Sequence, residues 1–298
     1  MDTLDLQDWV GRQEISFADI IPTQAQAMAA ILDWEDTTQP VGQKLPAPWH
    51  WLYFLPTPKT SDIDIDGHAR RGGFLPPVPL PRRMWAGSRI NFHTPLCIGD
   101  STRRVSTIKN VTSKQGGSGE LVFVTISHDI YVLEVDLKTE RLAISEEQDI
   151  VYREVTTSSV PFQKAPSEQP DWSQQVNTDP VLLFRFSALT FNGHRIHYDR
   201  SYAIDIEGYD GLVVHGPLTA SFLLNLLRNN LPDATLKTFM FRGIRPLMDM
   251  GSFMIEGRLE RGNVHLRALD ANGALVMKAE ATISQDHRQR SIMPDLQS

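Results

Sequence analysis

The sequence has 298 residues, which is enough for two domains of ordinary size or one large domain. Its 41% hydrophobic and 22% charged residues exclude a disordered or fibrous chain. The formal net charge of −7 argues against nucleic acid as the main partner, because phosphate binding requires a basic face.

The start of the chain and its cysteine content bear on the compartment. The first residues, MDTLDLQDWVGRQEI, are acidic, whereas signal and transit peptides are basic. No stretch approaches the roughly 18 apolar residues that cross a bilayer. The single cysteine, Cys97, excludes an intrachain disulfide and suits a reducing environment. We therefore expect a cytoplasmic protein without a membrane segment.

The predicted elements form two similar halves. Residues 23–34, TQAQAMAAILDW, favour a helix. Long alternating strands with glycine-containing turns occupy residues 90–132 and again 239–284. Between them, residues 154–180 are polar and proline-containing without an apolar period, which predicts a linker. Each half has an aromatic strand start, a Pro-Leu pair and a glycine, namely Phe92, Pro95-Leu96 and Gly99, then Phe239 with Phe241, Pro246-Leu247 and Gly251.

Residues 215–232, HGPLTASFLLNLLRNNLP, predict a buried helix. Pro217 stands near its first turn and Pro232 ends it. Its leucines make it apolar almost all round, as expected of a helix wrapped by a sheet. We therefore predict an α+β double hot dog, with two tandem antiparallel sheets each wrapped around a central helix. The expected segments are an N-terminal domain of residues 1–153, the linker 154–180 and a catalytic C-terminal domain of residues 181–298.

His194 and His197 lie three residues apart in the stretch FNGHRIHYDRSYA. A lone histidine on a loop is more often structural than functional. A zinc site needs three or four ligands, and the sequence offers only His194, His197 and distant His215, without a cysteine pair. We therefore expect no metal. The remaining interpretation is acid–base chemistry, because a neutral histidine can take up and return a proton near physiological pH.

The stretch VVHGPL predicts a strand that runs into the N-terminus of the buried helix at Gly216. Such an N-terminus offers unpaired N–H groups and the positive end of a dipole. Glycine there lets a ligand approach the backbone closely. These features suit the oxygen of a thioester that must carry negative charge.

Residues 184–220, FRFSALTFNGHRIHYDRSYAIDIEGYDGLVVHGPLTA, resemble the MaoC-like hydratases and dehydratases, also called type 2 enoyl-CoA hydratases. The family signature is an aspartate, a turn and Asn-Pro-x-His, followed by His-Gly at the start of the central helix. The resemblance implies that His197 is the catalytic base and that Gly216 supplies an oxyanion-hole N–H, with Pro217 beside the substrate. His194 is then a structural neighbour in the loop.

Asn192 departs from the family signature because it stands where most members have the catalytic aspartate. An amide cannot act as a carboxylate base. Its side chain can still orient the water by hydrogen bonding, which leaves the proton transfers to His197.

Residues 48–100 resemble the two-domain branch of this family, whose members typically carry the form FNxHRIHYD. That branch includes hydratases of mesaconyl-C4-CoA (3-methylfumaryl-CoA) and itaconyl-CoA, and mitochondrial-type 3-hydroxyacyl-thioester dehydratases. The resemblance implies a hydro-lyase that adds water reversibly to an enoyl-CoA. The expected substrate is mesaconyl-C4-CoA or itaconyl-CoA, and the product is citramalyl-CoA.

Two pairs of arginines are candidates for contact with this substrate. Arg82 and Arg83 lie in the apolar stretch PLPRRMW, and Arg242 and Arg245 lie in FRGIRPL. Arginine binds CoA phosphates and a free carboxylate through the same bidentate fork. The alternative is that these arginines form surface ion pairs with the many acids of the chain.

Other functions stay open. A 3-hydroxyacyl-ACP dehydratase of fatty-acid synthesis would use the same chemistry. A non-catalytic acyl-thioester-binding hot dog belongs to a different class, and Asn192 would then mark a lost active site. A thioesterase is disfavoured because the central helix contains no Asp or Glu. The sequence has no P-loop or dinucleotide fingerprint, so we expect no nucleotide or nicotinamide cofactor. The expected partner is an acyl-CoA thioester, and any homodimer would have two-fold symmetry.

Overall fold

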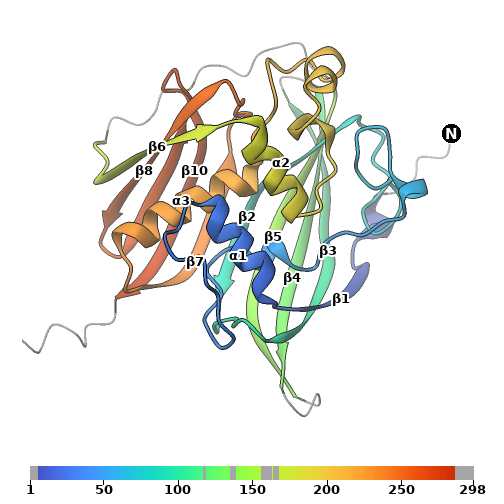
Figure 1. Ribbon diagram of the computed structural model, residues 1–298. Coiled ribbons are helices and arrows are strands. Elements are labelled where there is room, and N and C mark those ends of the chain that lie inside the picture. Colours follow the sequence, from blue (N-terminus) through green and yellow to red (C-terminus); the bar gives the residue numbers. More distant parts are fainter. Residues whose placement is uncertain (1–5, 117–118, 135–138, 156–162, 164–167, 286–298) are drawn as a thin grey trace, which may run out of the picture.

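The computed structural model describes residues 6–116, 119–134, 139–155, 163 and 168–285. Their strands form a ten-stranded antiparallel sheet, and the helices α1, α2 and α3 lie on one face of it (Figure 1). The strands are β1 (Gln13–Asp19), β2 (Arg82–Phe92), β3 (Ser101–Gly116), β4 (Gly119–Leu133), β5 (Glu140–Arg153), β6 (Trp172–Thr178), β7 (Ala234–Gly243), β8 (Gly251–Glu260), β9 (Asn263–Leu269) and β10 (Leu275–Gln285). The helices are α1 (Pro22–Ile31), α2 (Pro180–Leu189) and α3 (Gly216–Asn230), with the short helices η1 (Leu6–Trp9), η2 (Trp49–Leu52), η3 (Thr60–Asp62), η4 (Arg195–His197) and η5 (Tyr202–Ile206).

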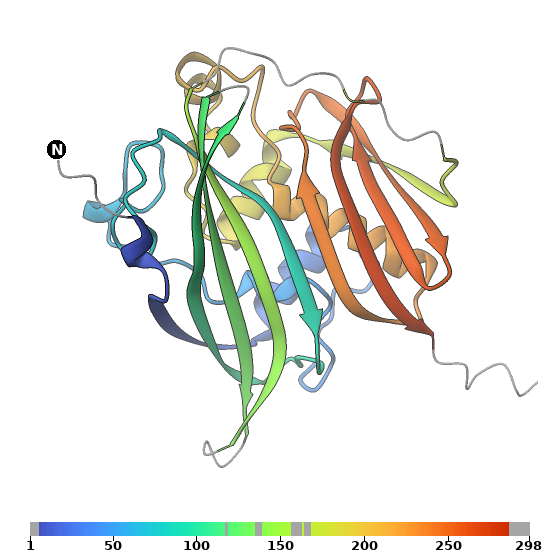
Figure 2. The ribbon, with the colours of Figure 1, turned by 180° about the vertical axis from the view of Figure 1, so that it is seen from behind.

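The order of strands divides the sheet into two halves. It runs β1-β3-β4-β5-β2-β7-β10-β9-β8-β6, so the first five strands of the chain lie on one side of the β2–β7 pair and the last five on the other. Figure 2 shows the two halves side by side, in green and in orange to red. The predicted α+β double hot dog is confirmed, with its two sheets joined edge to edge into one.

The internal repeat is real, but the aromatic residues do not start its strands. Gly99 and Gly251 have φ angles of +100° and +116° at equivalent places, before β3 and at the start of β8. Phe92, however, ends β2, and Phe239 and Phe241 lie inside β7. Both strands begin earlier than predicted. Their first residues include arginines and threonines, which do not form a simple apolar pattern, so the sequence did not indicate these starts.

The predicted buried helix is α3, which begins at Gly216 and ends at Asn230, two residues before Pro232. It packs against β6 to β10. Ten consecutive residues, Leu218 to Leu227, are buried, because the curled sheet and neighbouring helices surround it. No helix among the described residues, α3 included, combines the length and apolar character needed to span a bilayer.

Among the described residues of the N-terminal half, no second helix is wrapped by the sheet as α3 is, contrary to our expectation. The predicted helix 23–34 exists as α1, but it packs against α2 and the short helix η2. η2 lies on the sheet face of this half, where His50 Nε2 lies 2.9 Å from Glu146 Oε2 and the Trp51 indole N–H also donates to Glu146. This aromatic turn shares the core of the half with the buried residues of α1.

The predicted linker 154–180 contains the strand β6, so its last part belongs to the sheet. Among the described strands, β6 pairs only with β8, at the edge of the sheet, and of its seven residues only Val176 and Thr178 are buried. A strand that buries so little has no apolar period, which is why the sequence suggested a linker. Residues 156–162 and 164–167 lie outside the described residues, and the two-domain division with a connection before β6 stays a prediction.

Gly87 allows the two halves to join. It opposes Arg242 in the β2–β7 pairing, which runs to Asn91 opposite Thr238. A Cβ on Gly87 would lie 2.4 Å from the carbonyl oxygen of Phe241. The close contact between the halves therefore requires glycine here.

We expect Gly87→Ala to lower the free energy of unfolding by about 1–3 kcal/mol, because the added methyl group overpacks the seam between the halves. Gly73→Ala is the matched control, since a Cβ at Gly73 meets no atom within 4 Å. Urea unfolding of the three proteins measures the difference. Equal stability of the two variants would contradict this account of the seam.

Candidate active site

The loop after α2 carries the predicted catalytic histidine. The chain leaves α2 through Phe191, whose φ is +50°, and turns into the short helix η4 that contains His197. Asp199 then accepts a hydrogen bond from the Tyr202 N–H at 3.0 Å, and its carboxylate pairs with Arg195 at 2.8 Å. These contacts hold the loop in a fixed shape against α3.

His197 is buried and its tautomer is fixed by one hydrogen bond. Only 8% of the residue is exposed, and Nδ1 lies 2.7 Å from the carbonyl oxygen of Val213. A carbonyl can only accept, so Nδ1 carries the proton and Nε2 is the unprotonated nitrogen. Burial is the main cause that lowers the pKa of His197 to about 4. Nε2 is therefore available as an acceptor at neutral pH.

Four histidine rings form a row beside the start of α3. His215 stacks on His197 with ring centroids 3.7 Å apart, and His194 meets His197 edge-on at 5.4 Å. His68, from the N-terminal half, lies 4.0 Å from His194. We call these four residues the histidine row. Burial lowers the pKa of each member, to about 2 for His194 and well below its usual value for His215.

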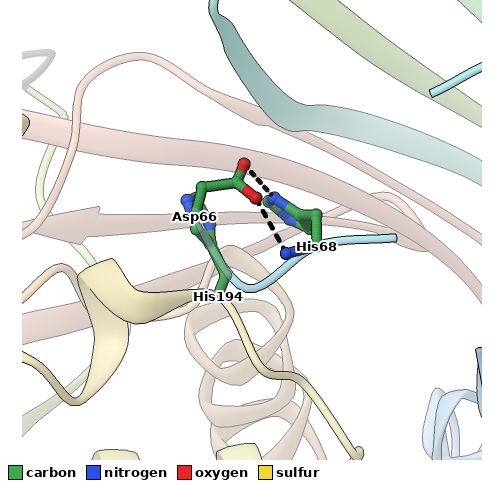
Figure 3. A group of neighbouring side chains, drawn as sticks. All are labelled: Asp66, His68 and His194. Carbon is green, nitrogen blue, oxygen red and sulfur yellow. Dashed lines mark hydrogen bonds and ion pairs between the residues drawn. The ribbon is translucent and has the colours of Figure 1, made fainter. Parts of the chain in front are cut away.

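Asp66 and His68 were not predicted as site residues. His68 Nδ1 lies 2.8 Å from Asp66 Oδ2, and its backbone N–H donates to Asp66 Oδ1 at 2.8 Å. Figure 3 shows this carboxylate facing the imidazole, with His194 of the other half beside the pair. The tripeptide Asp66-Gly67-His68 was the signal that could have indicated them. It is followed by two arginines, so this part of the sequence resembles a basic turn exposed to solvent.

Gly67 lets the loop that carries this pair approach the loop that carries His197. A Cβ on Gly67 would lie 1.8 Å from the carbonyl oxygen of Gly193, and the φ of Gly67 is +89°. The Arg195 N–H donates to the carbonyl oxygen of Asp66 at 2.9 Å. The candidate site is thus assembled from both halves of the chain.

Gly216 opens α3 at the end of the histidine row. His215 is the residue that precedes the helix, and Pro217 occupies its first turn. A Cβ on Gly216 would be 3.9 Å from Met277 Cε and 4.0 Å from the carbonyl oxygen of Trp85, so residues of both halves surround this point. The first N–H groups of a helix lack partners within the helix, which suits the predicted oxyanion role.

Asn192 shapes the loop. Its Oδ1 accepts a hydrogen bond from the His194 N–H at 3.0 Å. The side-chain oxygen is therefore occupied by the backbone of the turn, and its amide group remains the part that can contact a water.

The two arginines of β2 face different surroundings. Arg82 pairs with Glu207 at 3.2 Å, donates to the Glu207 carbonyl and lies over the ring of Tyr209 at 5.4 Å. Arg83 lies close enough to the histidine row for its charge to lower the pKa of both His68 and His194. The side chain of Arg83 contacts Tyr152, the residue opposite it on β5.

The second arginine pair lies on other parts of the sheet. Arg242, opposite Gly87 in β7, is exposed, and its charge helps to lower the pKa of Asp149. Arg245 pairs with Asp270 at 3.8 Å. Two residues further on, Leu247 bonds to the Val214 N–H, so Arg245 lies near the segment that enters α3.

Two sets of residues can be considered for a metal. In the trio weighed from sequence, His197 and His215 stack face to face, and one nitrogen of each is bonded, to Val213 and Ser187. Asp66, His68 and His194 have ligand atoms within 4.8 Å of one another. Both oxygens of Asp66 accept hydrogen bonds from His68, however, which leaves two histidines, fewer than the three protein ligands of a catalytic zinc site.

Known proteins resemble this chain across both of the halves that form the candidate site. The family model for hydroxyacyl-thioester dehydratase type 2 matches residues 48–249, which span both halves of the site. Mesaconyl-C(4)-CoA hydratase of Chloroflexus aurantiacus is 46% identical over 283 residues, covering 94% of this chain and 98% of that protein. The mitochondrial hydroxyacyl-thioester dehydratase type 2 of Schizosaccharomyces pombe is 27% identical over 66% of this chain and 72% of its own length.

A solved structure supports the fold. A MaoC-like dehydratase from Phytophthora capsici aligns with a TM-score of 0.65 at 13% identity, covering 96% of this chain and all of that one. The chain therefore belongs to the hydroxyacyl-thioester dehydratase type 2 family of MaoC-like enzymes, which are hydratases and dehydratases.

Proposed function

We propose that the protein is a hydro-lyase that hydrates mesaconyl-C4-CoA reversibly to citramalyl-CoA, with itaconyl-CoA as the second candidate substrate. The observation that carries this proposal is the 46% identity to a mesaconyl-C(4)-CoA hydratase over nearly the full length of both proteins. The site geometry supports it independently, because an unprotonated imidazole nitrogen lies near the N-terminus of a buried helix.

In the proposed reaction the backbone N–H groups at the start of α3, with Gly216 first, hold the thioester oxygen. Negative charge develops on this oxygen when water adds to Cβ, and a helix N-terminus stabilises it. Nε2 of His197 accepts a hydrogen bond from the attacking water and activates it. Asn192 fixes the turn that carries His194 and offers its amide group to the same water.

Arg83 is the best candidate to bind the second carboxylate of a C5 dicarboxyl thioester. Its charge helps to lower the pKa of His68 and His194, and its side chain contacts the neutral Tyr152, whereas Arg82 pairs with the carboxylate of Glu207 and lies over Tyr209. Arg71 donates to the carbonyl groups of Val78, Leu80 and Pro81 and so fixes the proline-rich segment that leads into β2. Arg245 and Pro217 remain candidates for contacts with the CoA portion.

A 3-hydroxyacyl-thioester dehydratase is the second candidate function. It is favoured by the description of the matching family and by the similarity to the fission-yeast enzyme. The reaction is the same dehydration equilibrium, so the acyl group distinguishes the two. A cytoplasmic location, expected from the single cysteine, completes the proposal.

The substrate class is tested with mesaconyl-C4-CoA, itaconyl-CoA, crotonyl-CoA and a long-chain 2-enoyl-CoA. Loss of enoyl-thioester absorbance follows the three conjugated thioesters, and chromatography of citramalyl-CoA follows itaconyl-CoA, whose C=C bond is not conjugated with the thioester. We expect rapid loss with the C5 dicarboxyl thioesters and slow loss with the other two. Preference for the long chain would assign the protein to fatty-acid dehydration. Absence of turnover on all four would favour a non-catalytic thioester-binding protein.

The role of His197 is tested by His197→Gln, which keeps a polar side chain but removes the imidazole. We expect kcat for mesaconyl-C4-CoA to fall by about 100-fold or more. His93→Gln is the matched control, because His93 bonds to Ser145 on β5 outside the histidine row. Turnover that survives in the His197 variant would make the catalytic assignment wrong.

The role of Arg83 is tested by Arg83→Gln. Loss of one arginine–carboxylate contact raises KM for mesaconyl-C4-CoA by about 10-fold or more and leaves KM for crotonyl-CoA nearly unchanged. Arg242→Gln serves as the control on the neighbouring strand. An equal rise in KM for both thioesters would instead place Arg83 at the CoA portion that they share.

A further inference from the structure

Hydration releases a proton from the attacking water, and some group must hold it until Cα accepts it. This question rests on the proposed function. The buried members of the histidine row are poor holders. His197 bonds to a carbonyl and His215 to the hydroxyl of Ser187, and both are almost fully buried. A cation there would have no hydrogen-bonded carboxylate, because position 192 is an amide.

His68 is the member of the row that contacts a carboxylate. Its Nδ1–H donates to Asp66 Oδ2 at 2.8 Å, so Nε2 is the unprotonated nitrogen. The side chains of His68 and Asp66 remain 25% and 22% exposed, which leaves the pair accessible from outside. A carboxylate in this position fixes the tautomer of an imidazole and stabilises the imidazolium that it forms.

The loop that carries the pair is held rigidly against the catalytic loop. The close approach of Gly67 to Gly193 leaves no room for a side chain, and the Arg195 N–H is bonded to the Asp66 carbonyl. His194 fills the space between His68 and His197, with its ring 4.0 Å and 5.4 Å from theirs. The position of the pair relative to His197 is therefore set by backbone contacts.

We propose that His68, positioned by Asp66, is the proton-carrying group of the hydratase site and that the N-terminal half supplies it in place of the aspartate missing at position 192. One O–H bond of the water breaks as its oxygen bonds to Cβ. The proton passes first to Nε2 of His197, which holds that water, and then by way of His194, whose ring lies between the two, to Nε2 of His68. The electron pair of the C=C bond moves toward the thioester. It returns to form the Cα–H bond when His68 gives the proton back, so the site ends as it began.

The surroundings of His68 keep it neutral in the resting site. Burial is the main cause that lowers its pKa, and the charges of Arg83 and Arg71 lower it further. The hydrogen bond to Asp66 and the Asp66 charge raise it. Burial alone would raise the pKa of Asp66, but its contacts with His68 and the charge of His194 lower it, so Asp66 stays ionised.

The test compares His68→Gln and Asp66→Asn with Asp64→Asn, a matched control that removes an exposed carboxylate from the same loop. We expect His68→Gln to lower kcat for mesaconyl-C4-CoA by about 100-fold or more with KM nearly unchanged, and Asp66→Asn to lower it by about 10-fold or more. Asp64→Asn retains wild-type kcat. Exogenous imidazole partly restores kcat in His68→Ala.

The pH profile separates a proton-carrying role from a structural one. His68 must be unprotonated to accept, so kcat falls as the pH drops through its pKa. Asp66 raises that pKa, and its removal therefore lowers it. In Asp66→Asn the acid limb of the kcat profile must move to lower pH. A structural role would reduce kcat without moving the limb.

Three results would overturn the proposal. The first is a wild-type kcat in His68→Gln, and the second is an acid limb of the kcat profile that does not move in Asp66→Asn. The third is an activity that chelators abolish and Zn²⁺ restores, because it would assign Asp66, His68 and His194 to a metal. If His68→Gln shows no thermal unfolding transition, this variant has not folded and its kcat is not informative. The pH profile of Asp66→Asn then decides, because asparagine keeps the shape of aspartate. Failure of the wild-type protein on every thioester would contradict the proposed function, whereas turnover by both wild type and His68→Gln contradicts this inference alone.

Discussion

The pairing of β2 with β7 is the interaction on which the remaining structure depends. It joins two curled sheets into one and brings the carbonyl of Trp85 beside Gly216 at the start of α3. It also lets the loop around Gly67 contact the loop around Gly193. The candidate active site lies where these segments meet, so neither half of the chain contains a complete set of its residues. The close backbone contacts at Gly67 and Gly87 are therefore requirements of the site as well as of the fold.

Burial and charge act against each other in this site. A site closed to water strengthens the hydrogen bonds that polarise a thioester, but it also disfavours any charged histidine. His197 and His215 illustrate the second effect, since burial lowers both of their pKa values. An aspartate at position 192 would stabilise a protonated His197, but the neutral amide of Asn192 cannot. In our proposal the carboxylate is that of Asp66, which lies 126 residues earlier in the chain, contacts His68 and is less buried. The charge stays at the more exposed end of the row.

The parts of the fold that could be predicted from the sequence are those with a local signal. The prolines at positions 217 and 232 bracketed α3, and the apolar residues between them indicated a wrapped helix. The double hot-dog architecture followed from that helix and the repeated strands. The parts that could not be predicted depend on tertiary contacts. β6 buries too little to show an apolar period, and η2 covers its half of the sheet in a way that no local pattern indicates. Arg82 and Arg83 could not be separated until their strand was known, because neighbours on a strand face opposite sides. Asp66 and His68 could not be predicted as site residues, because only the tertiary contact between His68 and His194 places them at the site.

The two halves of the sheet are covered differently, by α3 in one and by η2 with α1 in the other, so the two copies of the repeat are not equivalent. In a symmetric dimer of single hot dogs, every substitution appears at both subunits, so a change that improves a supporting loop also alters the catalytic loop of the partner. Once the two copies are fused in one chain, each position can vary alone. Here one copy carries the buried helix and the histidine loop, and the other carries η2 and the Asp66–His68 loop. A substitution in one copy can therefore alter its own loop without altering the loop of the other.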